Sequence, residues 1–121
     1  MPEAPILVID DDVAILDTVA EILAFEGYSV MTAANGADGL RCTEQSRPGL
    51  ILLDMRMPVM DGWAFAQALR ARGAAPPIVV MTAAQDARRW AQEIGATGYL
   101  AKPFELHDLI DVVQRIYAPK S

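Results

Sequence analysis

Residues 5–12 read Pro-Ile-Leu-Val-Ile-Asp-Asp-Asp, an apolar run that ends in three aspartates. A continuous apolar run of this length is typical of a strand buried on both faces, because a half-exposed strand alternates apolar and polar residues. The apolar residues that follow have the spacing of a helix and precede a glycine stop: Ile15, Leu16, Val19, Ile22, Leu23 and Gly27. The chain is therefore predicted to begin with a buried strand and a helix.

The same alternation continues along the chain. Further strands are predicted at 28–32, 49–53, 78–81 and 98–101, and further helices at 37–45, around 63–69, at 87–94 and at 106–116. Strands that alternate with helices imply right-handed crossovers, and hence a doubly wound parallel sheet with helices on both faces. The second and fifth strands are less uniformly apolar, so we expect them at the edges. The fold class is α/β, with five strand-helix units.

Composition limits the classes of function. The 121 residues, 53% of them apolar, fit one domain over 1–121. A net charge of −6 argues against direct binding of nucleic acid, which requires clustered Lys and Arg. No run approaches the roughly 20 apolar residues of a membrane span, and Cys42 has no second cysteine to pair with. We expect a cytoplasmic protein that does not enter membranes.

Polar side chains follow four of the apolar runs: Asp10 and Asp11, Asp54, Thr82, and Lys102. In an open parallel sheet these positions share one edge, and ligands bind beyond the carboxyl ends of the strands. Each residue also has a structural interpretation. Lys102 could be a counterion to the acids and Thr82 a turn residue, but the coincidence of all four favours a functional site.

The aspartates at this edge are suited to a hard divalent cation such as Mg²⁺, which prefers carboxylate oxygens and retains several waters. Asp12 is better explained as a helix N-cap. An aspartate beside such a cation can attack a phosphoryl group and form an acyl phosphate. Lys102 and Thr82 are the types of side chain that contact phosphoryl oxygens, by charge and by hydrogen bond respectively.

Four segments in this order resemble the receiver domain of the response regulators of bacterial two-component systems. Residues 6–12 are similar to its acidic-pair motif, 52–62 to its phosphorylation segment, 81–83 to its switch segment and 95–104 to its lysine segment. The resemblance covers nearly the whole chain. It implies a flavodoxin-like (βα)5 fold with strand order 2-1-3-4-5.

The resemblance also implies roles for individual residues. Asp54 would accept the phosphoryl group, and Mg²⁺ would be held by the side chains of Asp10, Asp11 and Asp54 with the backbone carbonyl of Arg56. Thr82, Lys102 and the backbone N–H of Ala83 would contact the phosphoryl oxygens. These roles describe a signalling switch that dephosphorylates itself, and not an enzyme with a separate substrate.

The implied partners follow from this switch. The phosphoryl donor would be a sensor histidine kinase or a histidine phosphotransfer protein. Movement of Thr82 on phosphorylation would let Tyr99 turn inward and change the face formed by the fourth helix, fifth strand and fifth helix, which would contact an output domain or target. A homodimer formed on phosphorylation is a further option. Pro103 matches a position that is often cis in the family.

On the residues alone, two other functions stay open, and the side chain of one residue, Arg56, has no assigned role. A phosphatase of the haloacid dehalogenase type needs a second aspartate two residues after the first, where Arg56 stands. A flavodoxin-like interaction module would keep the fold without phosphorylation, which the full set of polar residues argues against.

Arg56 is a long cation beside the site, and we hypothesise that it contacts the phosphoryl group or an acidic neighbour. For Trp90 we favour simple packing on the sheet.

Overall fold

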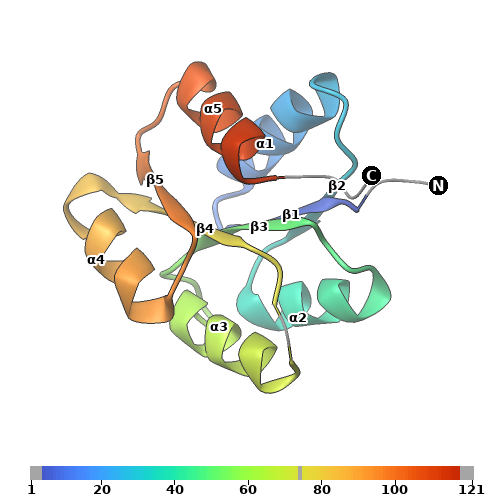
Figure 1. Cartoon of the computed structure of the whole chain (residues 1–121), viewed down its shortest axis with the longest axis vertical. Helices are drawn as coiled ribbons and strands as arrows, with labels where there is room; N and C mark the ends of the chain where they lie inside the picture. The colour runs from blue at the N-terminus through green and yellow to red at the C-terminus, as the bar shows by residue number, and fades with distance from the viewer. Residues whose placement is uncertain (1–3, 74, 118–121) are drawn as a thin grey trace.

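The computed structural model describes residues 4–73 and 75–117, so the ends of the predicted 1–121 domain lie outside the described residues. Five parallel strands form one sheet in the order β2-β1-β3-β4-β5 (Figure 1). The predicted strand order and edge positions are confirmed. The strands are β1 (Ile6–Ile9), β2 (Val30–Ala33), β3 (Leu50–Asp54), β4 (Ile78–Ala83) and β5 (Gly98–Lys102).

Helices cover both faces of this sheet. Figure 1 shows α1 (Val13–Phe25) and α5 (Leu106–Ile116) on one face, with α2 (Gly36–Gln45), α3 (Gly62–Ala71) and α4 (Ala84–Ile94) on the other. Side-chain oxygens of Asp12, Asn35 and Asp61 cap the first three helices. Because such caps satisfy amide groups that the helix leaves unpaired, they define where each helix starts after its strand.

Two apolar cores result from the alternation of side chains along the strands. Ile6 and Val8 of β1 point to the core under α1 and α5, whereas Leu7 and Ile9 point to the core under α2, α3 and α4. The central strands are buried along their length except for Ala83 at the end of β4, as their continuous apolar sequences predict. Because the helices cover both faces of the central strands, the accessible parts of the sheet are its strand ends and its edge strands, β2 and β5.

Several predicted boundaries differ from the structure by one to three residues, and the fourth strand runs on to Ala83 instead of ending at residue 81. The second strand begins at Val30 and not at residue 28, because the Tyr28 N–H ends α1 by donating to the Leu23 carbonyl, and the Tyr28 ring packs edge-on against Tyr117. The fourth helix begins at Ala84, three residues before the predicted start. Its first turn lacks the apolar periodicity that marks a helix in sequence.

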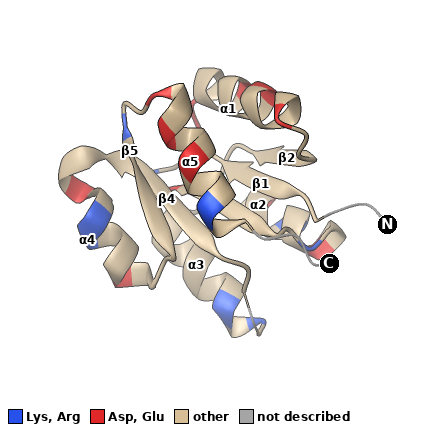
Figure 2. Ribbon diagram, turned by 45° about the horizontal axis from the view of Figure 1, so that its top comes forward, with Lys and Arg blue, Asp and Glu red and all other residues tan. Residues whose placement is uncertain are grey.

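Among residues 4–73 and 75–117, no helix combines the length and apolar character that a membrane crossing requires. Basic residues of the described chain are dispersed over α2, α3, α4, α5, several loops and the end of β5 (Figure 2). That distribution agrees with the prediction that the domain does not bind nucleic acid directly, which stays a prediction.

Candidate functional site at the carboxyl edge of the sheet

The sheet register brings the predicted site residues to one edge. Ile9 pairs with Leu53, so Asp10, which follows β1, is level with Asp54, the last residue of β3. On the neighbouring strand Met81 is level with Asp54, and Thr82 lies one residue further along. Lys102 ends β5. As whole residues, Asp10, Asp54 and Thr82 are 0%, 7% and 6% exposed.

Asp10 organises the centre of this site. One of its carboxylate oxygens accepts a 2.9 Å hydrogen bond from the Asp12 N–H, and the other accepts a 2.7 Å hydrogen bond from Lys102 Nζ. Asp12 in turn accepts hydrogen bonds from the N–H groups of Ala14 and Ile15, which confirms its predicted role as the N-cap of α1. Asp10 is therefore held in place by both its own loop and the lysine.

Lys102 also lies 3.6 Å from Asp54 Oδ1. Burial, reinforced by the negative charge of Asp10, raises the pKa of Asp54 to about 7, although the charge of Lys102 acts in the opposite direction. Burial alone would lower the pKa of Lys102, but its hydrogen bond to Asp10 and the charge of Asp54 outweigh this and raise the pKa. The site thus contains more negative charge than its single lysine neutralises.

Three carboxylates of this site could hold a metal ion. One oxygen from each of Asp10, Asp11 and Asp54 lies within 4.8 Å of the others, and Asp11 is exposed to solvent. Oxygen ligands on one open side suit Mg²⁺, which keeps several of its waters. A divalent cation would also neutralise the excess negative charge. The donor set therefore fits the predicted metal.

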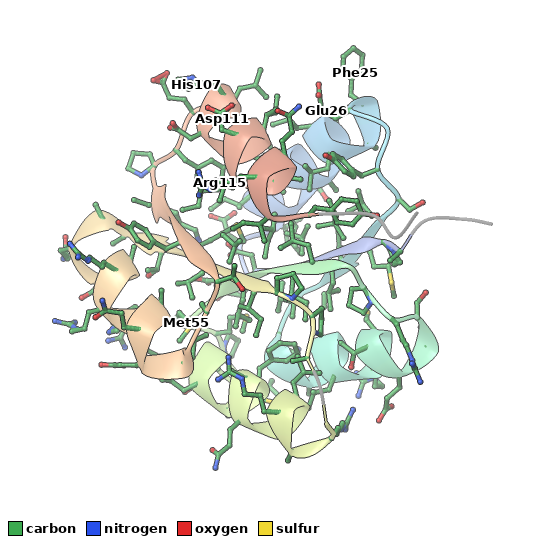
Figure 3. All side chains as sticks on the ribbon, in the orientation of Figure 1. Phe25, Glu26, Met55, His107, Asp111 and Arg115 are labelled. Carbon is green, nitrogen blue, oxygen red and sulfur yellow. The ribbon has the colours of Figure 1, made fainter. Side chains whose placement is uncertain are left out.

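The loop after β3 packs closely against the end of that strand, next to Asp54. The Gly62 N–H donates a 2.9 Å hydrogen bond to the Met55 carbonyl, and a Cβ at position 62 would lie 2.8 Å from Met55 Cα and 3.0 Å from the Asp54 carbonyl oxygen. Figure 3 shows Met55 on the α3 side of the sheet, where it is fully buried. Close backbone contact at Gly62 thus supports the end of β3.

The other predicted residues occupy separate positions around the edge. Ala83 ends β4, directly before α4, and Tyr99 on β5 is 46% exposed. The Lys102–Pro103 peptide bond is cis, as the resemblance implied. The guanidinium of Arg56 stacks over Trp90 at 5.0 Å from the ring centroid and makes no ion pair with any described acid.

Sequence reasoning missed an aromatic cluster beside the site. The rings of Trp63 on α3 and Trp90 on α4 meet edge to face at 4.9 Å, and Trp63 Nε1 donates a 2.9 Å hydrogen bond to Glu93. Trp90 is buried, as the packing interpretation expected, but it packs on α3 and on Arg56 as well. The two tryptophans are 27 positions apart, so no local spacing signals this contact.

A doubly wound parallel sheet with three acids and a lysine gathered at its carboxyl edge defines an α/β protein whose ligand site lies beyond the ends of its strands. Residues 6–114 match the family described as the response regulator receiver domain. The chain belongs to this family, whose members act in phosphorylation-based signalling.

The chain is also similar to bacterial regulatory proteins. The transcriptional regulatory protein PrrA of Mycobacterium tuberculosis is 40% identical over 113 residues, which cover 92% of this chain and 48% of PrrA. The response regulator MprA of Mycobacterium avium is 39% identical over 107 residues, covering 87% of this chain and 47% of MprA. The chain thus spans about half the length of these curated relatives.

Solved structures have the same fold. Chemotaxis protein CheY4 of Vibrio cholerae superposes with a TM-score of 0.85 at 34% identity, covering 93% of this chain and 98% of CheY4. A putative response regulator of Chloroflexus aurantiacus gives a TM-score of 0.88 at 31% identity, covering 97% of this chain and 98% of that protein. The flavodoxin-like fold predicted from the resemblance is confirmed.

Proposed function

We propose that Asp54 is the phosphoryl acceptor of this receiver domain. The observation that carries the proposal is the position of its carboxylate, which ends β3 beside Asp10 and Asp11 and within 3.6 Å of Lys102 Nζ. A nucleophilic carboxylate needs access to the donor and positive charge near the transferred group. Asp54 lies beside a lysine at the carboxyl edge of the sheet, and 10% of its side chain stays exposed to solvent.

The proposed donor is a phosphohistidine of a sensor histidine kinase or of a histidine phosphotransfer protein. A carboxylate oxygen of Asp54 attacks the phosphorus in line, the P–N bond breaks, and an acyl phosphate forms as the donor imidazole departs. Hydrolysis later transfers the phosphoryl group to water and restores the carboxylate. The protein is thus proposed to act on itself and not on a separate substrate.

The proposed metal is Mg²⁺, held by Asp10, Asp11, Asp54 and the backbone carbonyl of Arg56. When bound, the ion would neutralise charge on the transferred phosphoryl group. Asp10 is fixed by the Asp12 N–H and by Lys102, so its orientation is set before any ion arrives. The exposed Asp11 lies on the open side from which a hydrated ion enters.

The proposed output is a change in the face formed by α4, β5 and α5. A phosphoryl group adds about −1.5 to −2 charges and three strong acceptors. The hydroxyl of Thr82, the N–H of Ala83 and the ammonium of Lys102 are the groups proposed to bind these acceptors. Tyr99 would then turn inward from its exposed position on β5. Phosphorylation shifts a population that exists beforehand.

This output face is the proposed contact for an output domain, a target protein or a second copy of the chain. Figure 3 shows His107, Asp111 and Arg115 along the outer side of α5. Both signs of charge are present there, which allows complementary ion pairs with a partner. The cytoplasmic location and the single-domain extent expected from the sequence stay part of this proposal.

Beryllofluoride, a mimic of the phosphoryl group, tests the proposed site. Fluorine NMR of the wild-type protein with Mg²⁺ and beryllofluoride should show one bound signal, which the Asp54→Asn variant should lack. Omission of Mg²⁺ should also remove the signal. An equal bound signal in Asp54→Asn would show that Asp54 is not the acceptor.

A further inference from the structure

The position of the Arg56 side chain is determined by an aromatic ring and not by an acid. Arg56 lies two residues after Asp54, and its guanidinium carbon is 5.0 Å from the centroid of the Trp90 ring on α4. Within the described chain it forms no ion pair, although three aspartates cluster at the adjacent strand ends. Arg56 is also exposed, so its side chain is free to move.

Trp90, in contrast, is a fixed platform. The residue is 6% exposed, and the ring of Trp63 packs edge-on against its indole at 4.9 Å between centroids. Trp63 is itself held by a hydrogen bond to Glu93, one turn further along α4. The guanidinium of Arg89 lies 5.9 Å from the same indole and pairs with Asp86. The indole thus joins α3 and α4 and offers a ring face to Arg56.

The charge of the site changes which contact Arg56 prefers. Three carboxylates oppose one lysine before modification, and a divalent cation brings this arrangement close to neutrality. A phosphoryl group then adds about −1.5 to −2 charges with three acceptor oxygens. Charge-assisted hydrogen bonds between a guanidinium and phosphoryl oxygens are stronger than a cation–π contact at an exposed position. Phosphorylation therefore favours transfer of Arg56 from the indole to the phosphoryl group.

We propose that Arg56 is a two-position residue, stacked on Trp90 in the unmodified protein and bound to the phosphoryl group once Asp54 is modified. The Trp90 ring then competes with the phosphoryl group for the Arg56 guanidinium, which makes Trp90 a positioning residue. The inference rests on the function proposed above. It has two consequences: Arg56 shields the acyl phosphate from water, and α4 loses a contact with the β3–α3 loop when the site is occupied.

The fluorescence of Trp90 tests the movement directly. The chain has two tryptophans, so the Trp63→Phe variant leaves Trp90 as the single reporter. Beryllofluoride with Mg²⁺ should change its emission, because a cation leaves the ring face. In the Trp63→Phe/Arg56→Met variant the change should be absent, while fluorine NMR shows that beryllofluoride still binds. Arg56→Lys, which keeps a cation, should retain part of the change.

Each outcome of this experiment bears on the proposal. A fluorescence change of full size in the Arg56→Met background would overturn it, because Trp90 would then respond to some other movement. Unchanged emission in Trp63→Phe with beryllofluoride bound would also overturn it. Failure of the wild type to bind beryllofluoride would instead remove the proposed function, and this inference with it.

The lifetime of phosphorylated Asp54 separates positioning from simple packing. Arg56→Met should shorten the lifetime about ten-fold, the change that corresponds to the loss of one hydrogen bond to a charged group. Trp90→Leu should lengthen it, because the competing platform is gone, and Trp90→Phe should lie nearer the wild type. The double variant Arg56→Met/Trp90→Leu should match Arg56→Met alone. An equal effect of Trp90→Leu with and without Arg56 would contradict the positioning role.

Discussion

Lys102 Nζ donates a 2.7 Å hydrogen bond to Asp10, although the two residues are 92 positions apart and belong to opposite halves of the sheet. The same ammonium lies further, at 3.6 Å, from Asp54. In the unmodified protein the lysine is therefore held mainly by a proposed metal ligand. A phosphoryl group on Asp54 would offer Lys102 a second, more highly charged partner. Lys102 therefore connects the proposed metal ligand Asp10 with the proposed phosphoryl acceptor Asp54.

The raised pKa of Asp54 predicts a pH-dependent effect of Asp54→Asn in the absence of metal. Asp54 has a pKa of about 7 in the folded protein, against about 3.9 when unfolded. Between these values the folded state binds more protons, so the contribution of Asp54 to stability is present below about pH 4 and is lost as the pH rises through 7. At pH 8 in EDTA, Asp54→Asn should raise the free energy of unfolding by an amount of the order of 2–4 kcal/mol.

Urea denaturation of both proteins at pH 8 and near pH 4 measures this difference. Near pH 4 the two free energies should agree, because the aspartate is then protonated in the folded state. The same gain at both pH values would mean that the burial of charge at Asp54 is not its cause.

Magnesium should stabilise the wild-type protein against heat, and Asp11→Asn should remove most of that effect. Asp11 is exposed and makes none of the hydrogen bonds that hold Asp10, so the metal-free stability should barely change. Loss of one anionic ligand should weaken Mg²⁺ binding about ten-fold or more. Melting temperatures over a Mg²⁺ titration give the affinity through linkage.

Asp12→Asn is the matched control for this titration. It removes the same charge from the adjacent residue, which is the N-cap of α1 and lies outside the acidic cluster, and asparagine caps as well as aspartate. If both variants weaken Mg²⁺ binding equally, the effect is one of net charge and not of ligation.

Gly62→Ala should reduce both stability and phosphorylation. The added Cβ would lie 2.8 Å from Met55 Cα and 3.0 Å from the Asp54 carbonyl oxygen, and backbone atoms cannot move aside as side chains do. We expect a loss of about 1–3 kcal/mol in the free energy of unfolding, with slower labelling of Asp54. Gly98→Ala is the control, since its Cβ would meet only the terminal methyl of Ile116. Equal losses would argue against a special constraint at Gly62.

Val59 adopts a left-handed conformation with φ of 70° and is 83% exposed. A branched residue is strained in this region, by roughly 1–2 kcal/mol, whereas asparagine tolerates it. Val59→Asn should therefore raise the free energy of unfolding by about 1 kcal/mol in urea titrations. Val59→Thr keeps the branch and loses apolar surface, so it should give no gain. A gain of similar size from threonine would exclude backbone strain as the cause.

Much of the fold could be predicted because the apolar residues of each strand give way to polar ones. These polar residues are either the N-cap of the next helix or part of the site. Asp12 and Lys102 mark such points, and both lie where the pattern places them. The start of α4 could not be predicted, because its first turn has no apolar stripe. The pair of Asp86 in the first turn with Arg89 in the next is a signal of this helix that the sequence does contain.

Residue types at the site were predictable, but pairings between distant elements were not. Parallel strands place Asp10 and Lys102 at one edge, yet only the order and register of the strands decide that they touch. The stack of Arg56 on Trp90 depends in addition on how α3 and α4 pack together. Such contacts follow from tertiary packing, which has no periodic signal in the sequence.

The most direct test of the central claim is to map the phosphoryl group after incubation with acetyl phosphate and Mg²⁺. Intact mass and peptide mapping should find a single phosphoryl group on Asp54 of the wild-type protein. Asp54→Asn should remain unmodified, and EDTA should prevent labelling of the wild type. Labelling of another residue in the wild type, or equal labelling of Asp54→Asn, would contradict the assignment of Asp54 as the acceptor.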